Sequence, residues 1–99
     1  LRFGNAALDC GQYILRAALG EIRLNNKEYQ LAELFMRHPH QVFSSEHLME
    51  KVWGLDAEAE IDVVWTYIGF LRKKLKQIGA NIELRTIRGA GYALDETGC

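Results

Sequence analysis

The segment Leu71-Arg72-Lys73-Lys74-Leu75 is followed, after a short connection, by Thr86-Ile87-Arg88-Gly89-Ala90-Gly91-Tyr92. The first segment is typical of an amphipathic basic helix. The second is typical of a hairpin whose two glycines permit positive φ angles and keep the tip slim. A cationic helix beside a hairpin with an arginine at its tip is a geometry that contacts neighbouring grooves of duplex DNA.

The helix that contains the first segment is predicted over residues 61–78 and ends at Gly79. Its apolar side chains recur in steps of three and four and predict one core-facing stripe, made of Ile61, Val64, Ile68, Leu71, Leu75 and Ile78. The opposite face contains Asp62, Thr66, Gly69 and Lys73, flanked by Phe70, Lys76 and Gln77. Trp65 lies roughly 100° from the centre of the stripe, so packing against the preceding loop and contact with DNA both stay open for it.

The rest of the chain divides into three blocks. Residues 1–24 contain short apolar runs separated by glycine and asparagine turns, which predicts an antiparallel β-meander. Residues 25–78 contain three helices, of which the first begins with a capping box formed by Asn25 and Glu28. The second starts near Ser44 or Ser45 and stops at Gly54. Residues 79–95 form the hairpin, with its first strand over 83–88 and its return over 92–94.

Composition indicates one globular domain, because 99 residues with 48% hydrophobic and 25% charged side chains support a single modest core. The net charge of -1 argues against a nucleic-acid binder, but its distribution does not. Residues 27–60 hold three Lys or Arg against seven acids, whereas residues 61–88 hold six against two. This segregation predicts a cationic surface around the third helix and the hairpin, although a solvated helix face would show the same clustering.

Other chemistry is weakly represented. His38, His40 and His47 lack the further ligands of a metal site, and Ser44 and Ser45 fit a helix N-cap better than a nucleophile. We therefore expect no enzyme, no catalytic residue, no metal and no cofactor. No apolar run is long enough for a membrane span, and we expect a cytoplasmic protein. The two cysteines, Cys10 and Cys99, fit a reduced pair better than a disulfide.

Four ordered motifs together resemble the OmpR/PhoB-type effector domain of bacterial two-component response regulators. They are Leu24-Asn25-Asn26-Lys27-Glu28-Tyr29, Leu48 through Val52-Trp53-Gly54, Tyr67-Ile68 through Leu71-Arg72-Lys73-Lys74-Leu75, and Thr86 through Tyr92. The resemblance covers essentially the whole chain. It implies an α+β winged helix-turn-helix fold: an N-terminal antiparallel β-meander, three helices and a C-terminal β-hairpin wing.

The resemblance also implies a set of DNA contacts. The third helix, residues 61–78, would enter the major groove, and Arg88 on the wing would enter the adjacent minor groove. Side chains toward base edges and grooves would be Thr66, Gly69, Phe70, Lys73 and Arg88. Those toward phosphates would be Tyr67, Arg72, Lys74, Thr86 and Trp53, although a purely core role fits Trp53 equally well.

The chain departs from the family pattern within the third helix. Trp65 replaces a common Asp, and Gly69 and Phe70 replace long polar or basic residues. Neither glycine nor phenylalanine makes bidentate hydrogen bonds to a base. Base readout is therefore expected to depend on Thr66, Lys73 and shape recognition by Arg88, with modest specificity.

The resemblance further implies the context of the domain. The acidic residues Asp56, Glu58 and Glu60 precede the third helix and would contact RNA polymerase, or would form a solvated connector that favours the helix N-terminus. A receiver domain is expected upstream of residue 1, phosphorylated by a histidine kinase, with dimers on tandem DNA half-sites. The alternative function is a winged-helix protein-docking module without direct DNA readout.

Overall fold

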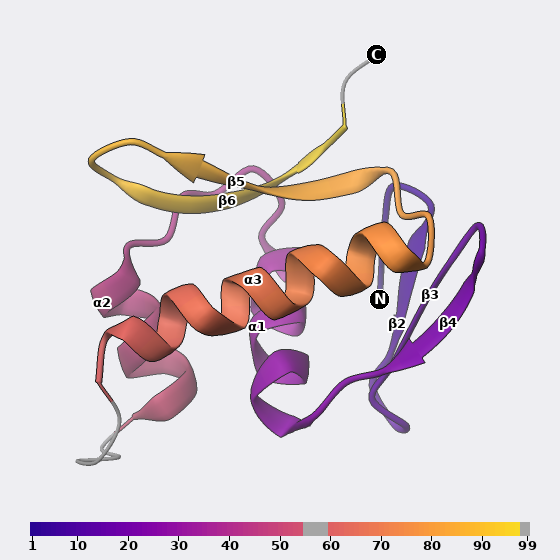
Figure 1. Ribbon diagram of the computed structural model, residues 1–99, viewed down its shortest axis with the longest axis horizontal. Coiled ribbons are helices and arrows are strands. Elements are labelled where there is room, and N and C mark those ends of the chain that lie inside the picture. The colour runs from indigo at the N-terminus through magenta and orange to yellow at the C-terminus, as the bar shows by residue number, and fades with distance from the viewer. Residues whose placement is uncertain (55–59, 98–99) are drawn as a thin grey trace.

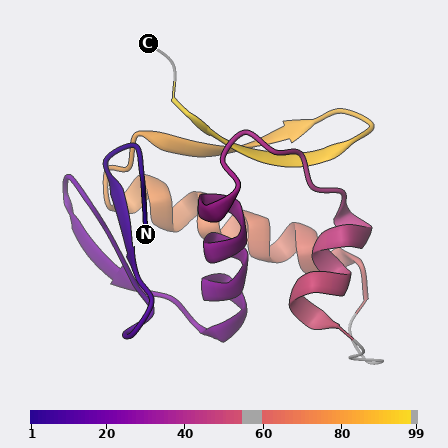
Figure 2. The same ribbon diagram turned by 180° about the vertical axis from the view of Figure 1, so that it is seen from behind.

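Two small β-sheets and three helical segments surround one core (Figure 1). The computed structural model describes residues 1–54 and 60–97. The long helix α3 crosses one side of the molecule, and α1 and α2 cover its other side, as the reverse view in Figure 2 shows. Among the described residues, no helix is both long and apolar enough to cross a membrane.

The N-terminal sheet is the predicted meander. It contains β1 (Arg2–Phe3), β2 (Ala6–Asp9), β3 (Ile14–Ala17) and β4 (Gly20–Arg23), antiparallel and in sequence order. Alternate side chains, among them Ala6, Leu8 and Leu15, point into the core. The tip of the β3–β4 hairpin reaches the end of α3, where the Leu19 N–H donates to the Ile78 carbonyl at 2.8 Å.

Helix α1 (Asn26–Arg37) begins with the predicted capping box. The Asn25 side chain accepts from the Glu28 N–H at 2.9 Å, and the Glu28 carboxylate accepts from the Asn25 N–H at 2.8 Å. Leu31 and Phe35 bury the apolar face of the helix. The capping box sets the start of α1 and keeps the Glu28 carboxylate, which is 3% exposed, inside the domain.

The second helix differs from the single short helix expected. It begins as α2 (Ser45–Leu48), with Ser44 as its N-cap, and continues as a π-helical segment, η1 (Met49–Trp53). The wider turn ends at Gly54, whose φ angle is 60°. Lys27 of α1 closes this end, because its Nζ donates to the Val52 carbonyl at 2.9 Å and lies 5.9 Å from the centre of the Trp53 ring.

Helix α3 (Asp62–Gln77) buries the predicted stripe with one exception. Val64, Ile68, Leu71 and Leu75 are buried in the core, as expected. Ile61 was predicted in the same stripe, but 45% of it is exposed. The helix begins at Asp62, so Ile61 is the N-cap residue and lies outside the regular helical face.

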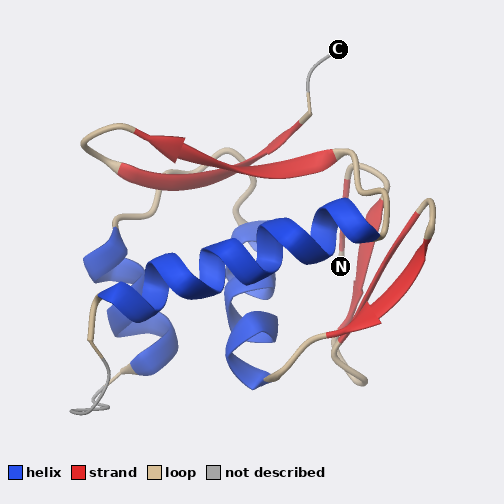
Figure 3. Cartoon of the chain, viewed as in Figure 1, coloured by secondary structure: helices blue, strands red, loops and turns tan. Residues whose placement is uncertain are grey.

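The wing consists of β5 (Ile82–Ile87) and β6 (Gly91–Glu96), paired antiparallel above α3 (Figure 3). The sequence predicted Arg88 as the last residue of the first strand, but Arg88 belongs to the turn between β5 and β6. A further bridge joins Phe43 to Tyr92, with N–H···O distances of 2.8 and 2.9 Å. Gly91 permits this approach, because a Cβ atom there would collide with the Phe43 backbone.

Candidate nucleic-acid interface

The outward face of α3 contains the residues predicted for base contact. Thr66, Gly69, Phe70 and Lys73 are all exposed, because they lie opposite the buried stripe. The Thr66 hydroxyl donates to the Asp62 carbonyl one turn earlier, at 3.2 Å. This surface offers a hydroxyl, an aromatic ring and an ammonium group along one side of a regular helix.

Three aromatic rings connect this face to the core. Trp53 and Tyr67 pack edge to face with 5.3 Å between ring centres, and Tyr67 and Phe70 do so at 5.4 Å. Trp53 is only 7% exposed, so it serves mainly as a core residue, the second of the two roles that the sequence left open. Tyr67 is half-buried between Trp53 and exposed Phe70.

Arg72 holds the wing against α3. Its Nε donates to the Leu84 carbonyl at 2.9 Å, and an Nη donates to the Thr86 hydroxyl at 2.8 Å. The guanidinium also lies 5.8 Å from the centre of the Tyr92 ring. Two residues predicted to bind phosphates, Arg72 and Thr86, are thus hydrogen-bonded to each other, an arrangement that the sequence pattern did not reveal.

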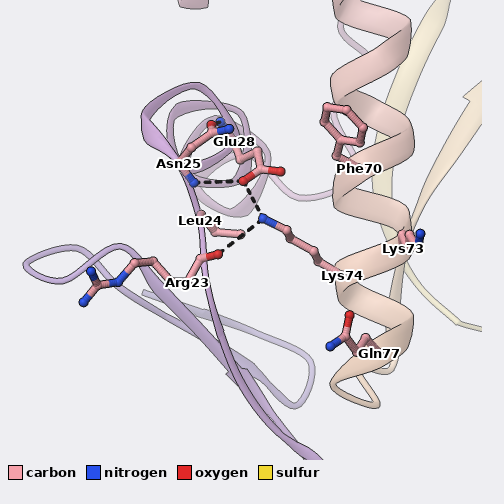
Figure 4. A pocket seen from close by; sticks show the side chains of 8 residues that line it. All are labelled: Arg23, Leu24, Asn25, Glu28, Phe70, Lys73, Lys74 and Gln77. Carbon is pink, nitrogen blue, oxygen red and sulfur yellow. Dashed lines mark hydrogen bonds and ion pairs between the residues drawn. The ribbon is translucent and has the colours of Figure 1, made fainter.

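Lys74 is placed differently from the sequence expectation, which pointed it toward DNA phosphates. Its Nζ lies 2.6 Å from the Glu28 carboxylate and 3.3 Å from the Arg23 carbonyl, as Figure 4 shows. The Lys74 side chain is 24% exposed and that of Glu28 is 3% exposed. The same Glu28 oxygen caps α1, so Lys74 neutralises a buried carboxylate and joins α3 to the start of α1.

The same close-up shows a shallow groove between the start of α1 and α3. Phe70, Lys73 and Gln77 line it from α3, whereas Arg23 and Asn25 line it from the opposite side (Figure 4). The groove opens beside the outward face of α3 and is therefore continuous with the candidate interface.

The wing presents Arg88 at its tip. Arg88 is exposed, and the following Gly89 adopts a φ angle of 76°. At the stem of the wing, Asp95 lies 2.5 Å from His40 Nδ1 and 3.2 Å from Arg85. The hydrogen bond with His40, followed by that with Arg85, lowers the pKa of Asp95 below its ordinary value.

Exposed cations gather around α3 and the wing. Lys73, Lys76 and Arg88 make no ion pair with any residue in 1–54 or 60–97. Of the predicted polymerase-contact acids, Glu60 is exposed directly before α3, whereas Asp56 and Glu58 lie outside the described residues. The unpaired cations and the aromatic face give this side of the domain the character of an anion-binding surface.

The remaining candidate chemistry is sparse. Within the described part of the chain, no three His, Cys, Asp or Glu side chains are grouped so that they could hold a metal ion. Cys10 is exposed and free, and Cys99 lies outside the described residues.

Comparison with known proteins finds relatives that are transcriptional regulatory proteins or response regulators. The family model for the C-terminal region of transcriptional regulatory proteins matches residues 20–94. The transcriptional regulatory protein DltR of Streptococcus agalactiae is 40% identical over 96 residues, covering 97% of this chain and 43% of that protein. The heme response regulator HssR of Staphylococcus saprophyticus is 38% identical over 93 residues, covering 94% and 42%. The chain thus spans less than half the length of these relatives.

Solved structures show the same architecture. The DNA-binding domain of the response regulator AdeR, solved in complex with an intercistronic region, superposes with a TM-score of 0.83 at 27% identity. That match covers 97% of this chain and 99% of the other. The C-terminal domain of the nisin resistance regulator NsrR gives a TM-score of 0.80 at 32% identity, with 99% of each chain covered. The predicted winged-helix fold is confirmed.

Proposed function

This chain belongs to the family of C-terminal domains of transcriptional regulatory proteins, and from this premise we propose that it binds double-stranded DNA sequence-specifically as the output domain of a response regulator. Membership of a family of transcription regulators confirms that the chain is not an enzyme. The DNA-binding domain of AdeR, which has the same fold, was solved in complex with an intercistronic region.

The observation that supports the proposal most directly is the location of two cations that make no ion pair with any described residue. Lys73 lies on the outward face of α3, and Arg88 lies at the exposed tip of the wing that packs along the same helix. In the proposed complex, α3 enters the major groove with Thr66, Gly69, Phe70 and Lys73. Arg88 enters the neighbouring minor groove, where narrow A·T tracts concentrate negative potential.

The backbone contacts follow from the same docking. Tyr67 and Thr86 offer hydroxyl groups at the edges of the α3 face, and Arg72 keeps N–H groups beyond those that it uses to hold the wing. Trp53 supports Tyr67 from below. Lys74 is left out of this set, because its ammonium is engaged with buried Glu28.

The wider context is also a proposal. We place a receiver domain upstream of residue 1, controlled by a histidine kinase, and dimers on half-sites about one helical turn apart. The acidic residues before α3 in the sequence, Asp56, Glu58 and Glu60, are proposed to contact RNA polymerase.

Selection of a random duplex pool by this domain tests the function. The expected result is an enriched motif, bound with an affinity that falls steeply between about 50 and 200 mM salt. Lys73→Ala should reduce the salt slope by about one unit. The matched control is Arg37→Ala, because Arg37 lies on α1 and pairs with Glu33 at 3.1 Å.

Two other outcomes would count against the proposal. Salt-sensitive binding without an enriched motif would contradict sequence specificity. Absence of binding even at low salt would favour the docking module, whose basic face would meet an acidic protein.

A further inference from the structure

Trp65, Gly69 and Lys73 are four residues apart and therefore form one row along α3. The middle position is bare, because a Cβ atom built on Gly69 meets nothing within 4 Å. Glycine is among the least favourable residues for the interior of a helix. Unlike Gly91, which a neighbouring backbone requires, Gly69 has no steric reason within the domain to be glycine.

The indole at one end of the row is mostly in water. Trp65 is 70% exposed, whereas the other tryptophan, Trp53, is 7% exposed. The sequence left packing and DNA contact open for Trp65. In the structure, the described residues leave most of its side chain uncovered. Isolated exposed apolar side chains are common, but this one borders the bare turn at Gly69. Lys73, which makes no ion pair with a described residue, follows one turn further along the row.

The row lies on the side of α3 that belongs to the candidate interface. Arg72 follows Trp65 by seven residues, which places both within about 20° of one line along the helix. Arg72 bonds to Leu84 and Thr86 of the wing, so this flank faces the wing. A DNA strand that runs across the outward face of α3 toward the tip of the wing would meet the row.

We propose that Trp65, Gly69 and Lys73 form a slot that reads the methyl group of a thymine in the major groove. The inference rests on the proposed DNA binding. Gly69 lets the edge of the base approach the helix backbone closely. The Trp65 indole covers the C5 methyl group, which thymine alone presents in the major groove. Lys73 contacts a neighbouring phosphate or acceptor atom. Gly69 thus permits base readout that its missing side chain seemed to remove.

Replacing each thymine of the selected duplex by deoxyuridine, which removes only the methyl group, tests this slot. In the wild-type domain, one replacement should weaken binding about fourfold, the factor that corresponds to burial of one methyl group. In Trp65→Ala, the same replacement should have no effect. Equal losses in both proteins, or no loss at any thymine, would overturn the slot while leaving DNA binding intact. If no duplex binds at all, the proposed function fails and the slot with it.

Gly69→Ala supplies a second, independent test. The added methyl group meets open space in the free domain, so the melting temperature should stay the same or rise. Affinity for the selected duplex should nevertheless fall. DNA should suppress acrylamide quenching of Trp65 fluorescence in the wild type, and in Gly69→Ala the quenching should persist in the mixture. Unchanged affinity in Gly69→Ala would overturn the close approach at this turn.

Discussion

Lys73 and Lys74 are neighbours in sequence but about 100° apart around α3. This rotation gives them different surroundings, since Lys73 is exposed on the outward face and Lys74 pairs with Glu28 in the interior. The buried carboxylate needs a counter-charge, because an isolated charge in the interior is costly. One lysine therefore remains available for DNA, whereas the other helps to set the position of the helix.

Lys74→Met should destabilise the domain by about 2–4 kcal/mol. Removing one partner of a fully buried ion pair costs about 3–5 kcal/mol. We expect a somewhat smaller loss here, because Lys74 is partly exposed and Glu28 still accepts a hydrogen bond from the Asn25 N–H. Urea denaturation measures the change. Lys73→Met is the matched control and should alter stability by no more than ~0.5 kcal/mol.

The paired substitution sharpens this prediction. Glu28→Gln combined with Lys74→Met should cost less than the sum of the single changes, because neither partner is then left as an unpaired charge. Strict additivity of the two changes in unfolding free energy would show that the contact contributes little.

Lys74→Ala should also leave the salt slope of DNA binding unchanged, in contrast to Lys73→Ala.

Arg88 is the residue on which minor-groove recognition is predicted to depend. Arg88→Ala should weaken binding by about 1–3 kcal/mol and reduce the preference for A·T steps beside the major-groove site. Affinities for duplexes that differ only in A·T or G·C flanks give the measurement. Lys76→Ala, which removes an exposed cation from α3, is the control and should keep the flank preference. A wild-type preference in Arg88→Ala would exclude this arginine from the minor groove.

At the scale of elements, the wing and α3 act as one unit because Arg72 joins them. Its planar guanidinium bonds at once to the Leu84 carbonyl and the Thr86 hydroxyl. The bridge between Phe43 and Tyr92 anchors the other strand to the segment before α2. Both strands of the wing are therefore tied to the helices, which fixes the position of Arg88 relative to α3.

Arg72→Lys should destabilise the domain by about 1–2 kcal/mol, because lysine keeps the charge but loses the forked donor geometry. Amide hydrogen exchange within β5 and β6 should accelerate more than exchange within α1. Arg85→Lys is the control, since the Arg85 side chain is exposed and donates one hydrogen bond among the described residues, to the Asp95 carboxylate at 3.2 Å. Equal exchange rates in wild type and Arg72→Lys would show that the wing is held by other contacts.

At the scale of the whole molecule, Asp95 connects segments distant in sequence. His40 belongs to the connection between α1 and α2, whereas Arg85 and Asp95 belong to β5 and β6. The folded-state pKa of Asp95 lies below its usual value of 3.8. Its carboxylate therefore contributes stability above that pH, and the contribution is lost as the pH falls through the folded-state pKa.

The free energy of unfolding should accordingly fall more steeply below about pH 4 in the wild type than in Asp95→Asn. Denaturant titrations at intervals of about one pH unit, between about pH 2 and about pH 6, give the comparison. Glu96→Gln changes the adjacent exposed residue and should keep the wild-type slope. Identical slopes in wild type and Asp95→Asn would contradict the role of this carboxylate.

Much of the architecture was predictable because it depends on local patterns. The capping box at Asn25, the buried stripe of α3 and the glycine turn after Arg88 each follow from residues near one another in sequence. The prediction for Ile61 was wrong because periodicity does not mark where the helix begins. No local sequence pattern marks the π-helical segment or the bridge between Phe43 and Tyr92.

The sequence by itself determined the order of elements, the family and the outward face of α3, because periodicity and turn residues act over a few neighbouring positions. Only the tertiary structure decided how the cations are used. Arg72 meets the wing 14 residues later, at Thr86, and Lys74 meets Glu28 across 46 residues of chain. Such pairs form when separate elements pack, so the partner of a charged side chain is fixed by the fold and not by its neighbours in sequence.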